Sequence, residues 1–184
     1  MKEVYVLRHS NWDGVTDALT DPAKRAAQSR AAKLPNFALV YASPFVRTAQ
    51  TAQLLTGKQP QLDERAAIPR VPEELRQQVA TLKATHPLRV AGALFSLKAV
   101  YPALETAGAA LVELINELLA CLPDGARALV VTHDGTMLAA QRVLGQVPMN
   151  SPLTANYAEL DGYVVRELSN HALQVVDLQT VNKT

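Results

Sequence analysis

The sequence has little that would cross-link the chain or attract a charged partner. It contains one cysteine, Cys121, and its 18 Lys and Arg residues nearly balance 17 Asp and Glu residues, for a net charge of +1. A single cysteine excludes an internal disulfide, and the apolar stretch 118–122 around it predicts a core position, which suits a reducing compartment. Because no strong charge of either sign is present, neither nucleic acid nor an anionic membrane is expected as a partner.

Long hydrophobic runs and glycine-rich phosphate loops are also missing. No apolar run is long enough to cross a bilayer, and residues 1–7 enter an expected strand without an apolar segment of signal-peptide length. The sequence has neither a G-x-G-x-x-G nor a G-x-x-x-x-G-K-[ST] loop, which argues against a nucleotide-binding protein. We therefore expect a soluble, cytoplasmic protein.

Short apolar runs alternate with helical patterns along the chain. Residues 4–7, 38–42 and 128–131 are continuously apolar and rich in β-formers, as in strands covered on both faces. Capping residues and apolar stripes predict helices over 22–34, 44–55, 73–84, 102–122 and 135–144, and a terminal strand pair over 157–168 and 172–178. This order predicts an α/β fold, with three α/β/α layers around a mostly parallel central sheet. The length fits a single domain over residues 1–184.

Residues 58–101 are the least regular part of the sequence. This segment has prolines at positions 60, 69, 72 and 87, and it contains one clear helical pattern from Glu73 to Ala84. We interpret it as an insertion into the sheet order. Insertions in α/β proteins often overhang the ligand site, and packing against the core is an equally good explanation.

Unusual polar residues follow three of the expected strands. Arg8 and His9 end the first, Ser43 follows the second with Arg47 in the next helical turn, and His133 follows a later one. Ligands of open α/β sheets bind beyond the carboxyl ends of the strands. Two histidines and two arginines are therefore predicted to meet in one crevice.

These residue types suit phosphate chemistry. Guanidinium groups match the oxygens of a phosphoryl group in bidentate fashion, and the start of the helix after Pro44 adds backbone N–H donors. A neutral imidazole can attack phosphorus and form a covalent intermediate that water later opens. We assign the attack to His9 and the stabilisation of transition-state charge to His133, although the residues alone also allow the reverse.

Three motifs resemble the histidine phosphatase, or phosphoglycerate-mutase-like, superfamily. Leu7-Arg8-His9 is similar to its Arg-His-Gly opening, the run over 43–52 to its Ser-Pro-x-x-Arg-Ala-x-x-Thr-Ala helix, and the run over 130–136 to its second histidine motif. The resemblance implies that His9 becomes phosphorylated and that the protein needs no metal and no organic cofactor. It also implies that phosphate is bound by Arg8, Arg47 and His133, to which we add Ser43 and Asn11 as substrate-binding residues at the pocket.

Two positions depart from the family pattern. Ser10 and Asp134 stand where glycine is usual, and Ser10 is compatible with the fold only if its φ is negative. A histidine followed by aspartate resembles instead the phytase and acid-phosphatase branch, in which that aspartate donates a proton.

The proton donor is left open among four carboxylates. Glu73 or Glu74 ranks first because of its position after the Arg47 helix, although an acidic first helical turn is also an ordinary helix feature. Asp134 ranks next, and Glu64 is last.

The expected function is hydrolysis of a phosphomonoester or a phosphohistidine. Small phosphorylated metabolites and phosphoproteins are the expected partners, and the segment 17–20 together with the short chain resembles small phosphohistidine phosphatases. The alternatives are a phosphoglycerate-type mutase and a non-catalytic phosphate-binding protein on the same fold. Trp12, after the nucleophile, is interpreted as a core anchor rather than a residue at the pocket mouth.

Overall fold

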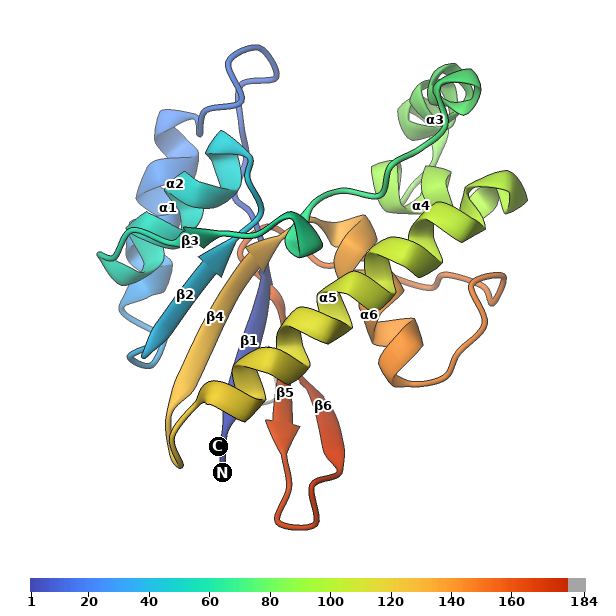
Figure 1. The fold of residues 1–184 in the computed structure, drawn as a ribbon. Coiled ribbons are helices and arrows are strands. Elements are labelled where there is room, and N and C mark those ends of the chain that lie inside the picture. The colour runs from blue at the N-terminus through green and yellow to red at the C-terminus, as the bar shows by residue number, and fades with distance from the viewer. Residues whose placement is uncertain (179–184) are drawn as a thin grey trace.

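A computed structural model describes residues 1–178 of the chain, and its centre is a six-stranded sheet in the order β3-β2-β4-β1-β5-β6 (Figure 1). The strands β3, β2, β4 and β1 pair in parallel, whereas β5 is antiparallel to both β1 and β6. The predicted mostly parallel sheet is therefore confirmed. The strands are β1 Glu3–Arg8, β2 Leu39–Ala42, β3 Gln61–Leu62, β4 Arg127–Thr132, β5 Gly162–Glu167 and β6 Leu173–Asp177.

Helices cover both faces of the sheet, as predicted. Side chains alternate along β1, so that Val4 and Val6 pack under α5 and α6, while Tyr5 and Leu7 pack under α1 and α2. Figure 1 shows these two helix pairs on opposite sides of the strands. The helices are α1 Asp21–Ala31, α2 Val46–Thr56, α3 Glu73–Thr85, α4 Arg89–Ser96, α5 Tyr101–Cys121 and α6 Asp134–Leu144, with 3-10 turns η1 Glu64–Ala66 and η2 Lys98–Val100.

The longest helix, α5, packs closely on α6 through a glycine. A Cβ added at Gly108 would lie 2.7 Å from the backbone carbon of Ala139, so only glycine allows this approach. The core position predicted for Cys121 is wrong, because its side chain is exposed. Leu118 in the apolar stripe of α5 and Leu122 just after the helix are both buried, whereas Cys121 lies beside that stripe at the last position of the helix.

The segment 58–101 leaves the sheet at β3 and forms α3 and α4. The hydroxyl groups of Thr132 and Thr136 donate to the carbonyls of Ala66 and Ala67, at 2.5 and 2.8 Å, and so fix its first part beside the end of β4. Figure 1 shows α3 on the side of the sheet where the arrows of β2 and β4 end. Helix α4 was not predicted, because its eight residues are too few for a helical period to be told from a short apolar run.

No helix within residues 1–178 is both long and apolar enough to span a membrane.

Candidate active site

The sheet register brings three segments of the chain to one edge. β4 lies between β1 and β2, with Arg8 opposite Thr132 and Ala42 opposite Val131. The next residues continue the ladder, since the backbone N–H of His9 donates to Thr132 and that of Ser43 to Val131, each at 3.0 Å. His9, Ser43 and His133 therefore follow three adjacent parallel strands at the same end.

Arg47 joins the two histidines. The ring centroids of His9 and His133 lie 5.1 Å apart, and only 8% and 3% of these residues is exposed. The Nε of Arg47 donates to Nε2 of His9 at 3.2 Å, and its Nη2 donates to Nδ1 of His133 at 3.3 Å. One edge of the guanidinium group thus faces both rings.

Hydrogen bonding defines the tautomer of each ring. Nδ1 of His9 lies 2.7 Å from the carbonyl oxygen of Ser10, which can only accept, so Nδ1 carries the hydrogen and Nε2 the lone pair. In His133, Nδ1 accepts from Arg47, so Nε2 donates to the hydroxyl of Ser43 at 2.9 Å. The lone pair of His9 Nε2 is therefore directed at the Nε–Nη2 edge of Arg47.

Burial keeps both imidazoles neutral. It lowers the pKa of His9 to about 4, against the hydrogen bond to Ser10 that raises it, and the positive charges of Arg47 and Arg8 lower it further. Burial, the neighbouring His9 and the same two arginines hold the pKa of His133 well below its ordinary value. A neutral His9 is the form that can act as a nucleophile.

Arg47 is held on its other sides by the loop that follows His9. Its Nη1 forms an ion pair with Asp17, and Asp17 Oδ2 also accepts from the backbone N–H of Val46 at 2.8 Å. The Cζ of Arg47 lies 4.8 Å from the ring centroid of Trp12 and 4.5 Å from that of Phe45. The expectation that Trp12 is a core anchor is wrong, since this half-buried ring packs on Arg47.

The second helix starts later than the Ser43-Pro44 pair predicts. It begins at Val46, and Ser43 does not cap it because its hydroxyl is bonded to His133. Asp17 supplies the acceptor at this helix start instead. Sequence reasoning missed Asp17, since nothing in the pattern of residues 11–20 shows that its side chain reaches another helix.

Arg8 and Asp134 form the other charged pair of the site. Nη1 of Arg8 donates to the carbonyl of Tyr157 at 2.6 Å and lies 3.6 Å from Oδ2 of Asp134. Asp134 Oδ1 accepts from the N–H of Gly135 at 2.9 Å. Among the described residues, Arg8 Nε and Asp134 Oδ2 are the buried side-chain N and O atoms without a hydrogen-bond partner. Buried polar atoms are normally paired, so these two atoms are exceptions within the described chain.

The remaining candidates lie outside this network. Glu73 is exposed and pairs with Arg76 one turn along α3, and Glu74 and Glu64 are also exposed. Within residues 1–178, no hydrogen bond or ion pair joins these three carboxylates to the two histidines. Asn11 is exposed, and its side chain accepts from the N–H of Trp12 at 2.9 Å.

Ser10 fits the negative backbone torsion that its position requires. It is absent from the residues with positive φ, and its N–H donates to the hydroxyl of Thr51 at 3.1 Å. In the described part of the chain, no group of three or more His, Cys, Asp or Glu side chains is arranged to hold a metal ion.

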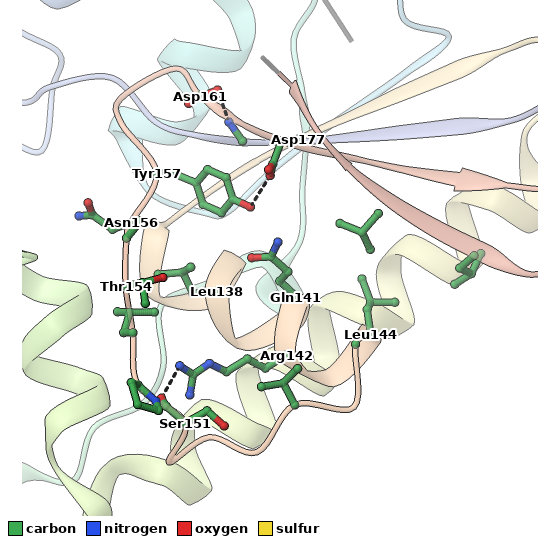
Figure 2. A pocket seen from close by; sticks show the side chains of 18 residues that line it. Leu138, Gln141, Arg142, Leu144, Ser151, Thr154, Asn156, Tyr157, Asp161 and Asp177 are labelled. Atoms are coloured by element: carbon green, nitrogen blue, oxygen red, sulfur yellow. Dashed lines mark hydrogen bonds between the residues drawn. The ribbon is translucent and has the colours of Figure 1, made fainter. Parts of the chain in front are cut away.

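A separate pocket of about 920 Å³ lies between α6, the segment 145–161 and β6 (Figure 2). Three of its polar side chains have partners beside the pocket: Tyr157 donates to Asp177 at 3.4 Å, and Arg142 donates to the carbonyl of Ser151 at 2.7 Å. Neither histidine of the site lines it.

Solved structures share this fold at low sequence identity. A mycobacterial glucosyl-3-phosphoglycerate phosphatase is 19% identical with a TM-score of 0.73, covering 96% of this chain and 98% of its own. Phosphoserine phosphatase from Entamoeba histolytica is 18% identical with a TM-score of 0.66 and covers 95% of each chain. Phosphoglycerate mutase from Bacillus anthracis is 15% identical with a TM-score of 0.65, covering 99% of this chain and 96% of its own.

Sequence comparison adds the family. The search of curated proteins gave no match. The model of the histidine phosphatase superfamily, branch 1, matches residues 4–178, which include both histidines, both arginines and Asp17. The chain therefore belongs to the histidine phosphatase superfamily, branch 1.

Proposed function

We propose that the protein hydrolyses phosphomonoesters through a phosphohistidine formed on His9. The observation that carries this proposal is the bridge from one edge of Arg47 to His9 Nε2 and His133 Nδ1. A phosphoryl group that replaces these two hydrogen bonds has the guanidinium fork of Arg47 on its oxygens and the lone pair of His9 facing its phosphorus. Small phosphorylated metabolites or phosphoproteins are the proposed substrates.

The reaction proceeds in two displacements. The Nε2 lone pair of His9 attacks phosphorus, the bond from phosphorus to the ester oxygen breaks, and the leaving group takes a proton. Water then attacks the phosphohistidine, which releases inorganic phosphate and returns the lone pair to Nε2. Arg8, Arg47 and His133 stabilise the charge on the phosphoryl oxygens in both steps, and Ser43 orients the ring of His133.

We assign the proton donor to Asp134. Its Oδ2 is buried and without a hydrogen-bond partner in the described structure, and it lies 3.6 Å from Arg8, a proposed phosphate ligand. The two glutamates of the α3 start, ranked higher on sequence position, face solvent. An acid at the leaving oxygen is required when the leaving group is a poor one, as in an alkyl phosphate.

The test removes the nucleophile. His9→Ala is expected to lower kcat/KM on an aryl phosphate, without added metal, at least about 10³-fold, because the covalent route is lost. His171→Ala changes an exposed histidine of the β5–β6 turn and is the matched control. Brief reaction with radiolabelled substrate and alkaline quench should trap acid-labile label on wild type only.

Unchanged turnover in His9→Ala would overturn the proposal. Transfer of the phosphoryl group to a second hydroxyl, instead of release of phosphate, would favour a mutase.

A further inference from the structure

The loop between β1 and α1 places a carboxylate on the phosphate-binding arginine, and the proposed chemistry does not use it. Asp17 contacts Nη1 of Arg47, whereas Nε and Nη2 of the same group face the two histidines. A phosphoryl group bound at the histidine edge therefore leaves the Asp17 ion pair intact. The negative charge of Asp17 stays beside the bound substrate.

Several contacts fix Asp17 in this position. The loop closes on itself through the pairing of Trp12 with Leu19, and the N–H of Leu19 donates to the side chain of Gln50 on α2 at 2.8 Å. Asp17 has a left-handed φ of 62°, and its Oδ2 accepts from the N–H of Val46. Because both carboxylate oxygens are bonded to α2, the negative charge of Asp17 is held beside Arg47.

The positive charge of Arg47 is already compensated, and neither imidazole adds another cation. Arg47 is paired with Asp17, Arg8 lies 3.6 Å from Asp134, and burial keeps both imidazoles neutral. Binding of the phosphoryl group itself uses the Nε–Nη2 edge of Arg47, where it replaces the hydrogen bonds to the two imidazoles, and the unpartnered Nε of Arg8. A second negative charge on the leaving group would find no further cation in this cluster, because Arg8 and Arg47 both hold the phosphoryl group, and it would be repelled by Asp17.

From this arrangement, and resting on the proposed function, we infer that Asp17 is a specificity-determining residue. It selects phosphomonoesters whose leaving group is neutral or cationic over those whose leaving group carries a second anion. The same ion pair also positions Arg47, so a test must separate charge selection from positioning.

Three esters of similar size separate the two roles. In 3-phosphoglycerate the leaving group is anionic, in glycerol 3-phosphate it is neutral, and in phosphoethanolamine it is cationic. Wild type should use the anionic ester least. Asp17→Asn keeps an oxygen acceptor for Val46 and removes the charge. It should therefore raise the ratio of kcat/KM for the anionic ester to kcat/KM for the neutral ester by about fivefold or more. It should also lower the corresponding ratio of the cationic ester to the neutral ester.

Asp13→Asn is the matched control, since it removes the same charge from the same loop. Asp13 bonds the N–H groups of Val15 and Thr16, at 2.9 and 2.8 Å, through an oxygen that asparagine retains. The ester ratios of this variant should stay within about twofold of wild type. A change in Asp17→Asn that is equal for all three esters would reduce Asp17 to a positioning residue and overturn the inference.

The dissociation constants of the three esters, measured by calorimetry, keep this result apart from the proposed function. Binding ratios that shift as above, with no phosphate released from any ester, would overturn the proposed hydrolysis and support the charge selection. Hydrolysis with unshifted ratios in Asp17→Asn would overturn the selection alone.

Discussion

The cluster at the strand ends and the pocket beside β6 differ in how their polar groups are satisfied. In the pocket, Tyr157, Asp177 and Arg142 bond to one another or to nearby backbone. In the cluster, Arg8 Nε and Asp134 Oδ2 are buried without a partner, and two imidazoles are held neutral next to two guanidinium groups. The pocket is distinguished by its volume, whereas the cluster is distinguished by buried polar atoms without partners and by histidines with lowered pKa values. The second property is the better indicator of a reactive site.

The two regions nevertheless share one segment of backbone. The side chain of Tyr157 lines the pocket, while its carbonyl accepts from Arg8 at 2.6 Å. The backbone N–H of Arg8 also donates to the carbonyl of Asp161, at 2.9 Å. The pocket wall thus helps to hold Arg8 in place. Variants that separate the functions of the two regions should therefore change side chains that lie in only one of them.

The largest difference is expected between two buried arginines. Arg47→Lys keeps a charge in the cluster but loses the fork, so kcat/KM on an aryl phosphate should fall about 10²-fold or more with little change in unfolding free energy. Arg142 donates to the carbonyls of Pro148, Met149 and Ser151 beside the pocket. Arg142→Lys should instead cost about 2 kcal/mol of stability, since it breaks these bonds, and leave kcat/KM within about threefold.

Urea unfolding and steady-state kinetics on the two variants measure both quantities. Equal losses of activity at similar stability would show that the two regions do not differ in function.

The role of Asp134 is expected to depend on the leaving group. Asp134→Asn should lower kcat/KM about 10²-fold on an alkyl phosphate and only about threefold on p-nitrophenyl phosphate, because nitrophenolate leaves without a proton. Glu73→Gln alters an exposed carboxylate paired with Arg76 and should change neither rate by more than about twofold. Equal losses on both esters would mean that Asp134 acts by holding Arg8. A loss confined to Glu73→Gln would restore the donor ranked first from the sequence.

Much of this site was accessible from the sequence because its residues follow buried strands. Continuous apolar runs locate β1, β2 and β4, and the parallel topology then places His9, Ser43 and His133 at one edge. Motif resemblance pointed to the same residues independently. These predictions depend only on chain order and strand direction, which the sequence encodes locally.

Other features depend on side-chain directions that no local pattern records. Asp17 reaches Arg47 across 30 residues, and its left-handed φ is not encoded by a glycine. Glu73 lies in an acidic first turn of α3, as expected, but the periodicity of that helix does not say whether the turn faces the site. Buried atoms without partners, such as Asp134 Oδ2, emerge only once all neighbours are placed.

The last predicted effect concerns pH and the buried imidazole of His9 in the cluster. The folded pKa of His9, about 4, lies below the value of about 6.5 for an unfolded histidine. The unfolded chain therefore binds more protons below pH 6.5, and stability falls as pH decreases from 6.5 towards 4. For His9 alone the loss should be about 2 kcal/mol between pH 8 and pH 5, since each pKa unit corresponds to about 1.4 kcal/mol.

Urea unfolding at several pH values can isolate that contribution. His9→Asn removes the titrating ring, so its stability should fall less between pH 8 and pH 5 than that of wild type, whereas His171→Asn, at the exposed hairpin turn, should run parallel to wild type. Saturating inorganic phosphate should flatten the wild-type curve, because a bound anion favours the protonated rings and raises their pKa. Parallel curves of unfolding free energy against pH for His9→Asn and wild type would mean that this ring titrates as an exposed one does. That result would contradict the neutral state of His9 inferred from its burial.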